Sequence, residues 1–319
     1  MDKRLTVKEL FKESNCVSDI KIRKILHEQY ELLTEKLIDE SYGSFKGQYQ
    51  SVKNMVKQVF NKIDNGETIN NGIESIIRVN GNIEGVGNVT LIVHWSLIND
   101  TVELPVSGKS FYENNEHKIV LYVKYGNTPK YDISSTMAHE IMHCFQKELP
   151  KVKDVNINSM ILYNYLLYFQ SQAPEEFSHY FFYGMYITFF IERTANISSV
   201  SNFMEEYFKN RDKNKISTLE YQNAIEKYDK YQMYEEVLEN MLHREIKNDD
   251  IKYINKCLTG KFKNIYNHNE DILLFDPQTF NVEVYISKKK EEIIKLCQET
   301  IEKMYKNIIN FIENYYGRD

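Results

Sequence analysis

The apolar residues in the first 65 positions of the chain recur with a helical period. In the run 51–63 they follow the i, i+3, i+4 spacing of an amphipathic helix, and Asn65-Gly66 then ends the run. We therefore predict a helical N-terminal flank over residues 1–66.

The pattern changes to that of β-strands between residues 72 and 125, where short runs of β-branched and aromatic residues are separated by turn-forming residues. The predicted strands are 73–79, 89–95, a broken third over 102–106 and 110–112, and 118–124. Pro105 and Gly108 interrupt the third strand, so we expect it at the edge of the sheet. The turn-rich segment 80–88 is expected to connect the first two strands.

Helical patterns return after Gly126. The predicted helices are one that begins at Asp132 or Ser134 and stops before Pro150, then 158–172, 174–196, 199–210, 218–247 and 288–314. Before the last helix, 272–287 is predicted as a hairpin with its turn at Asp276-Pro277. This order predicts an α+β fold, with a catalytic core over 67–211 and a mainly helical C-terminal region over 212–319.

The composition suits a folded protein without a basic surface. Hydrophobic residues make up 42% of the 319 residues, which is enough for a sizeable core. The formal net charge is −6 and the isoelectric point is about 5.9, whereas proteins that bind nucleic acids usually have a strongly basic face. We expect no nucleic-acid partner.

The N-terminus and the cysteines favour a cytoplasmic protein. The chain begins with charged residues and lacks the apolar run of a secretory signal peptide, and its four cysteines are widely spaced without a CxxC pair. The most apolar stretch, 180–191, is shorter than the roughly 20 residues of a membrane-spanning helix. We therefore predict a buried helix there and no membrane partner, while an unusual export route stays open.

The segment Thr136–Phe145, with the sequence TMAHEIMHCF, contains an HExxH motif. On a helix, His139 and His143 lie on one face and can offer two imidazole nitrogens to one metal ion, and Glu140 beside them can act as a general base. No glycine or proline interrupts the predicted helix, and most neighbours of the motif are apolar. The alternative is a helix with two surface histidines and a coincidental acid.

TMAHEIMHCF resembles the active-site helix of the zincin metallopeptidases, and the order of the strand KIVLYVK, a loop and this helix is similar to theirs. The resemblance implies a zincin-like fold, with a small mixed sheet, an active-site helix and a glutamate helix, and helical flanks added at both ends. It also implies one zinc ion per chain and a peptide or protein substrate.

The third metal ligand needs a separate choice, because a catalytic zinc usually has three protein ligands. Gln146 and Leu149 stand where metzincins have glycine and histidine, so the resemblance leaves the gluzincin arrangement, with a glutamate from a later helix. Glu192 is our choice, because a carboxylate after an apolar run needs a partner if it is buried. The alternatives are that Glu192 marks the point where a buried helix surfaces, or that Glu175, Glu176 or His179 is the ligand.

The segment that contains Glu192 also has an ExxAN pattern, similar to that of the phage and mobile-element peptidases that cleave immunity repressors. In that family the glutamate is the third ligand, which matches Glu192. Asn196 lies one turn later and is expected to accept a hydrogen bond from the outer nitrogen of a ligand histidine. The longer gap before this segment, filled by the predicted helix 158–172, departs from that family.

The expected chemistry is hydrolysis of a peptide bond, with Glu140 taking a proton from water and delivering one to the leaving amine. The resemblance implies a downstream Tyr or His that stabilises the oxyanion, and the candidates are His243, Tyr180 and Tyr183, with His179 lining the cleft. Three alternatives stay open: a zinc amidohydrolase acting on a non-peptide amide, a non-catalytic zinc-binding interaction protein, and an accidental motif without metal.

Overall fold

The computed structural model describes residues 58, 61–62, 69–70, 74–83, 87–96, 106–123, 129–148, 157–209, 217–263 and 271–316. The chain forms two compact units, the first made of residues 1–153 and 194–210 and the second of 154–193 and 211–319. The protein is α+β, as predicted. The predicted N-terminal flank, 1–66, lies almost entirely outside the described residues.

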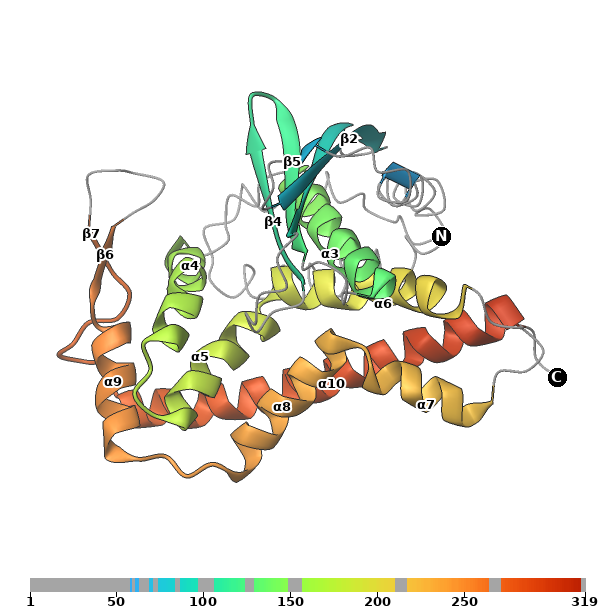
Figure 1. The fold of residues 1–319 in the computed structure, drawn as a ribbon. Coiled ribbons are helices and arrows are strands. Elements are labelled where there is room, and N and C mark those ends of the chain that lie inside the picture. The colour runs from blue at the N-terminus through green and yellow to red at the C-terminus, as the bar shows by residue number, and fades with distance from the viewer. Residues whose placement is uncertain are drawn as a thin grey trace, which may run out of the picture. The chain divides into compact units, whose positions relative to one another are not determined.

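The first unit contains a mixed five-stranded sheet (Figure 1). In spatial order its strands are β1 (Ile69–Asn70), β2 (Glu74–Ile83), β3 (Gly87–Ser96), β5 (Glu116–Val123) and β4 (Val106–Glu113). β3 and β5 are parallel and all other pairs are antiparallel. Strands lie in three of the predicted places, and the third predicted strand is at the edge, as β4. The expected break in it is wrong, because β4 runs without interruption through Gly108, while residues 102–105 of that prediction lie outside the described residues.

The segment 80–88, predicted as a turn-rich connection, largely belongs to the strands. Asn80–Ile83 of β2 pairs with Gly87–Thr90 of β3. Asparagine side chains support this pairing, since Asn82 donates to Asn88 at 3.0 Å and Thr90 donates to Asn80 at 3.1 Å. Polar cross-strand pairs thus extend the ladder through residues that favour turns when they stand alone.

Helix α3 (Lys130–Glu148) packs against one face of the sheet. The core consists of alternate residues of the strands and of helical positions of α3, among them Leu91, Leu121, Met137 and Ile141. The burial of this stripe against the sheet fixes the orientation of α3. Ile141 of the HExxH motif belongs to the stripe, and the other residues of the motif lie outside it.

The predicted helix 174–196 is wrong in its extent. The chain forms α5 (Glu176–Thr188) and α6 (Phe190–Phe208), separated at Phe189, whose φ of −59° and ψ of 137° are not helical. Neither glycine nor proline marks this break. The predicted boundary between 196 and 199 does not exist, because α6 continues through it, with Ser198 and Ser199 donating to carbonyl oxygens one turn back. Glu192 consequently lies in the first turn of a new helix.

The second unit is mainly helical. Its elements are α4 (Ile157–Ser171), α5, α7 (Thr218–Glu226), α8 (Asp229–His243), α9 (Asn248–Leu258), the strand pair β6 (Lys261–Lys263) and β7 (Asp271–Leu273), and α10 (Val282–Tyr316). The long α10 packs against α5, α8 and α9. The predicted helix 218–247 is therefore two helices, and α9 was not predicted.

The predicted hairpin over 272–287 is also wrong. A turn does occur at Asp276, but β7 pairs with the preceding β6, and α10 begins at Val282. The alternating Val282, Val284 and Ile286 suggested a strand. Ile286, however, is the first of the buried apolar positions of α10, which continue through Ile293, Cys297, Met304 and Ile308 at helical spacing.

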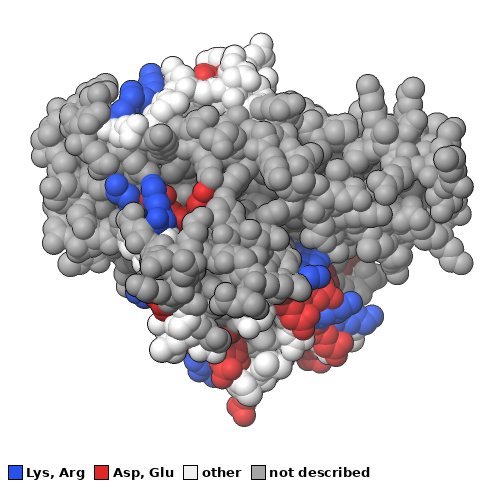
Figure 2. Space-filling model, turned by 90° about the vertical axis from the view of Figure 1, so that its right-hand side faces the viewer, with Lys and Arg blue, Asp and Glu red and all other residues white. Residues whose placement is uncertain are grey.

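None of the described helices combines the length and the apolar composition that a membrane crossing requires. On the face shown in Figure 2, the described lysine and arginine side chains lie among acidic ones. Charge is therefore mixed over the described part of this face.

Candidate metal centre

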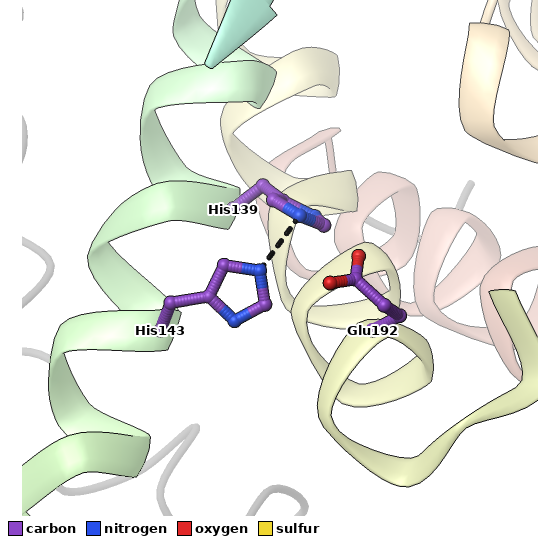
Figure 3. Close-up of side chains that lie close together, drawn as sticks. All are labelled: His139, His143 and Glu192. Carbon is purple, nitrogen blue, oxygen red and sulfur yellow. Dashed lines mark hydrogen bonds between the residues drawn. The ribbon is translucent and has the colours of Figure 1, made fainter. Parts of the chain in front are cut away.

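Helix α3 brings His139 and His143 together one turn apart. Their Nε2 atoms lie 3.0 Å from each other and their ring planes are at 87°, so the two nitrogens converge on one point (Figure 3). His139 is buried and His143 is half-buried. This pair is the expected consequence of the i, i+4 spacing on a regular helix.

Glu192 of α6 completes a group of three. One ligand atom from each of His139, His143 and Glu192 lies within 4.8 Å of the others, and Figure 3 shows the carboxylate facing the two imidazoles. The three residues predicted as metal ligands thus form a possible metal-binding group, the one such group found in the described part of the chain.

The donor set and its spacing fit a small tetrahedral ion. Ligand atoms about 2.0–2.1 Å from a tetrahedral ion lie about 3.3 Å apart, close to the separation of the two Nε2 atoms. Two imidazoles and one carboxylate also leave a fourth position free for water or substrate. The geometry is therefore compatible with a zincin-like arrangement.

A hydrogen-bonded relay fixes the orientation of His143. Its Nδ1 lies 2.7 Å from Oε1 of Gln146, and the amide nitrogen of Gln146 donates to Oγ1 of Thr194 at 2.6 Å. Because Gln146 donates through its nitrogen, its oxygen accepts from Nδ1–H of His143. The lone pair of His143 is then on Nε2, the atom that faces Glu192 and His139.

Gln146 and Thr194 were not among the predicted residues of the site. Gln146 follows His143 by three residues on the same helix, which places it within reach of the outer ring nitrogen, and this spacing could have identified it. The predicted partner, Asn196, is 2% exposed and lies one turn after Glu192. Its bond to a ligand histidine stays a prediction.

Glu192 is buried together with its neighbour Arg193, each with 4% of its surface exposed. The alternative that Glu192 marks the point where a helix surfaces is therefore wrong. Arg193 lies 3.6 Å from Glu299 of α10, and Glu192 accepts a hydrogen bond from the hydroxyl of Tyr163 on α4. Burial, followed by the charge of Glu192, raises the pKa of Tyr163, so its hydroxyl is a donor.

The side chain of Glu140 reaches the edge strand β4. It is 5% exposed, and a Cβ atom at Gly108 would lie 2.8 Å from both Cγ and Oε1 of Glu140. Only a residue without a side chain leaves this space to the carboxylate. The candidate general base is therefore held directly against the backbone of the edge strand.

The other candidate ligands have different partners. Glu175 pairs with Lys247 and Glu176 with Arg244, both at 2.5 Å, at the start of α5. His179 lies 3.2 Å from the amide nitrogen of Gln170, which joins α5 to α4. None of the three belongs to the group formed around His139.

The candidate oxyanion residues are distributed along α5 and α8. His243 is exposed in the last turn of α8, 3.7 Å from Glu239, and Tyr180 donates to Glu236 at 2.5 Å. Tyr183 is half-buried, and burial is the main cause of its raised pKa. Their roles in catalysis stay predictions.

No family model, no curated protein and no solved structure matches the chain. The chemistry of this centre therefore has to be inferred from its own residues.

Proposed function

We propose that this protein is a zinc-dependent peptidase of the gluzincin type, with Glu140 as its general base. The observation that carries the proposal is the convergence of His139, His143 and Glu192 at one point, with the buried carboxylate of Glu140 next in sequence to the first ligand. A structural histidine pair would not need a third, buried carboxylate aimed at the same point.

In this proposal His139, His143 and Glu192 hold the ion. When bound, zinc supplies a Lewis acid that polarises a carbonyl group and makes water acidic near neutral pH. Glu140 accepts the proton of the attacking water and then passes a proton to the leaving amine. Gln146 keeps Nε2 of His143 unprotonated, because its Oε1 accepts a hydrogen bond from the protonated Nδ1.

The edge strand β4 suits an extended peptide substrate. It lies at the end of the strand order and pairs only with β5 among the described strands, so its other edge can form main-chain hydrogen bonds with a substrate strand. Gly108 of this strand contacts Glu140. A peptide added along β4 would thus run past the proposed general base.

The ExxAN pattern at Glu192, Ala195 and Asn196 supports a likeness to the peptidases of immunity repressors. In this chain helix α4 lies between the two motifs along the sequence, which is the departure from that family noted above. We therefore propose peptide-bond hydrolysis as the reaction, and we do not propose repressors as the substrates.

The test combines elemental analysis with digestion of a broad peptide library by the full chain. We expect about one zinc ion per chain, and cleavage that Glu140→Gln reduces by about 10²–10⁴-fold while zinc is retained. Zinc binding without cleavage of any peptide would overturn the peptidase proposal in favour of a non-catalytic zinc-binding protein. A fully active Glu140→Gln variant would overturn the assignment of the general base.

A further inference from the structure

The side chain of Tyr163, on helix α4, contacts the candidate ligand Glu192. Its hydroxyl donates a hydrogen bond to Oε1 of Glu192. Tyr163 and Glu192 belong to the same compact unit, although α4 and α6 are separated by the whole of α5 along the chain. No motif in the sequence distinguishes Tyr163 from the other tyrosines, of which the chain has 24 in all.

The ring of Tyr163 also contacts the residue that directly precedes α6. It stacks on Phe189, with centroids 4.6 Å apart and planes at 23°, and on Tyr186, with centroids 5.4 Å apart and planes at 11°. Phe189 is the non-helical residue between α5 and α6, and Glu192 follows in the first turn of α6. One side chain therefore contacts both the break that starts the helix and the ligand that the helix carries.

These contacts have a direct consequence for metal binding. A glutamate side chain has several rotatable bonds and two equivalent oxygens, so an unrestrained carboxylate can turn away from the ion or chelate it through both oxygens. A donor fixed by stacking removes this freedom, since it keeps one oxygen bonded and sets the plane of the carboxylate.

We infer that Tyr163 is a positioning residue for Glu192, which holds the carboxylate as a single-oxygen metal ligand and makes helix α4 part of the metal centre. The inference rests on the proposed metal site. It assigns a function to the helix that separates the two motifs in the sequence, which otherwise would be only a structural insertion.

The test is the variant Tyr163→Phe in the full chain, which keeps the ring and its stacking and removes only the hydroxyl. Affinity for Zn²⁺ is measured by competition with a chromophoric chelator, and the Co²⁺-loaded protein is compared by visible absorption, which reports the coordination number. We expect the affinity to fall about 10- to 100-fold and the Co²⁺ bands to change in intensity.

Tyr165→Phe is the matched control. Tyr165 is on the same helix, is also half-buried, and packs its ring on Phe262 and Phe169 with no role proposed at the metal. We expect its metal affinity to stay within about twofold of the parent chain. In a Glu192→Ala background, Tyr163→Phe should cause no further loss of affinity, because its effect acts through Glu192.

The outcomes separate this inference from the proposed function. If the parent chain binds no metal, both are overturned. If the parent binds zinc and Tyr163→Phe has the same affinity and the same Co²⁺ spectrum, the role of Tyr163 is overturned and the metal site stands. A loss of affinity that persists in the Glu192→Ala background would also overturn it, since the residue would then act by another route.

Discussion

The two helices of the candidate metal centre, α3 and α6, position their candidate ligands in different ways. On α3, His139 and His143 are neighbours because they are four residues apart on one regular helix. On α6, the position of Glu192 depends on where the helix begins and on Tyr163 from another helix. A ligand pair can therefore be encoded by local sequence, whereas the third ligand requires tertiary contacts.

The largest expected effect separates the two kinds of ligand. A protein ligand accounts on average for about 10²–10³-fold of affinity, if the roughly 10–16 kcal/mol of a structural zinc site is shared by its four ligands. Removal of His139 should exceed this average, because it also breaks the imidazole pair on α3. We expect His139→Ala to lose zinc on dialysis and Glu192→Ala to bind it more weakly than the parent but measurably, as determined by elemental analysis. Parent-like zinc content in Glu192→Ala would show that Glu192 is not a ligand. The contrast between the ligands of α3 and that of α6 would then not hold.

A second effect concerns catalysis without a change in metal binding. Gly108→Ala places a methyl group where the side chain of Glu140 lies, so the carboxylate must shift. Because displacing a reacting group by about 1 Å can cost about 10²-fold in rate, we expect kcat/KM to fall by up to that factor with zinc content unchanged.

The matched control for this substitution is Lys109→Ala on the same strand, where the side chain is exposed. It should leave cleavage near the level of the parent chain. Equal activities of the parent and Gly108→Ala would show that Glu140 does not depend on its contact with β4.

A smaller effect should follow from the relay between α3 and α6. Gln146→Ala removes the acceptor for Nδ1 of His143 and the link to Thr194. Zinc affinity should fall about 10-fold, and Gln146→Glu, which keeps an acceptor, should restore most of it. Chelator competition checks both variants. If the two lose affinity equally, the relay does not set the tautomer of His143.

The smallest effect is on stability, at Glu205 of α6. Burial and the neighbouring Glu206 raise the pKa of Glu205 to about 7. A carboxyl group whose pKa is higher in the folded state stabilises the fold below its unfolded pKa, near 4.5, and this stability is lost as the pH rises to about 7. Glu205→Gln should therefore raise Tm at pH 8 by about 1–3 °C and leave it unchanged at pH 4.

Glu226→Gln, at an exposed site on α7, is the control for removal of a negative charge. Thermal unfolding at both pH values measures the difference between the two variants. An equal rise in the Tm of Glu205→Gln at pH 4 and at pH 8 would mean that the ionisation of Glu205 does not cause the rise.

The strands and the HExxH helix agree with their predictions because their local patterns and their tertiary environment favour the same structure. Alternate residues of β2, β3 and β5 face the core, and α3 buries one stripe against them. The start of α10 differs, because Val282 to Ile286 alternate as in a strand while the buried positions that follow recur at helical spacing. Long-range packing of α10 decided between the two.

By itself, the sequence determined the α+β class, the edge position of β4 and the paired histidines, since each of these follows from a period or spacing within one segment. It also identified Glu192, through the cost of burying an unpartnered carboxylate. Only the tertiary structure decided where α6 begins and which side chains hold the ligands. Tyr163, Gln146 and Thr194 act across segments that are distant in the chain, and no local pattern specifies which side chains meet there.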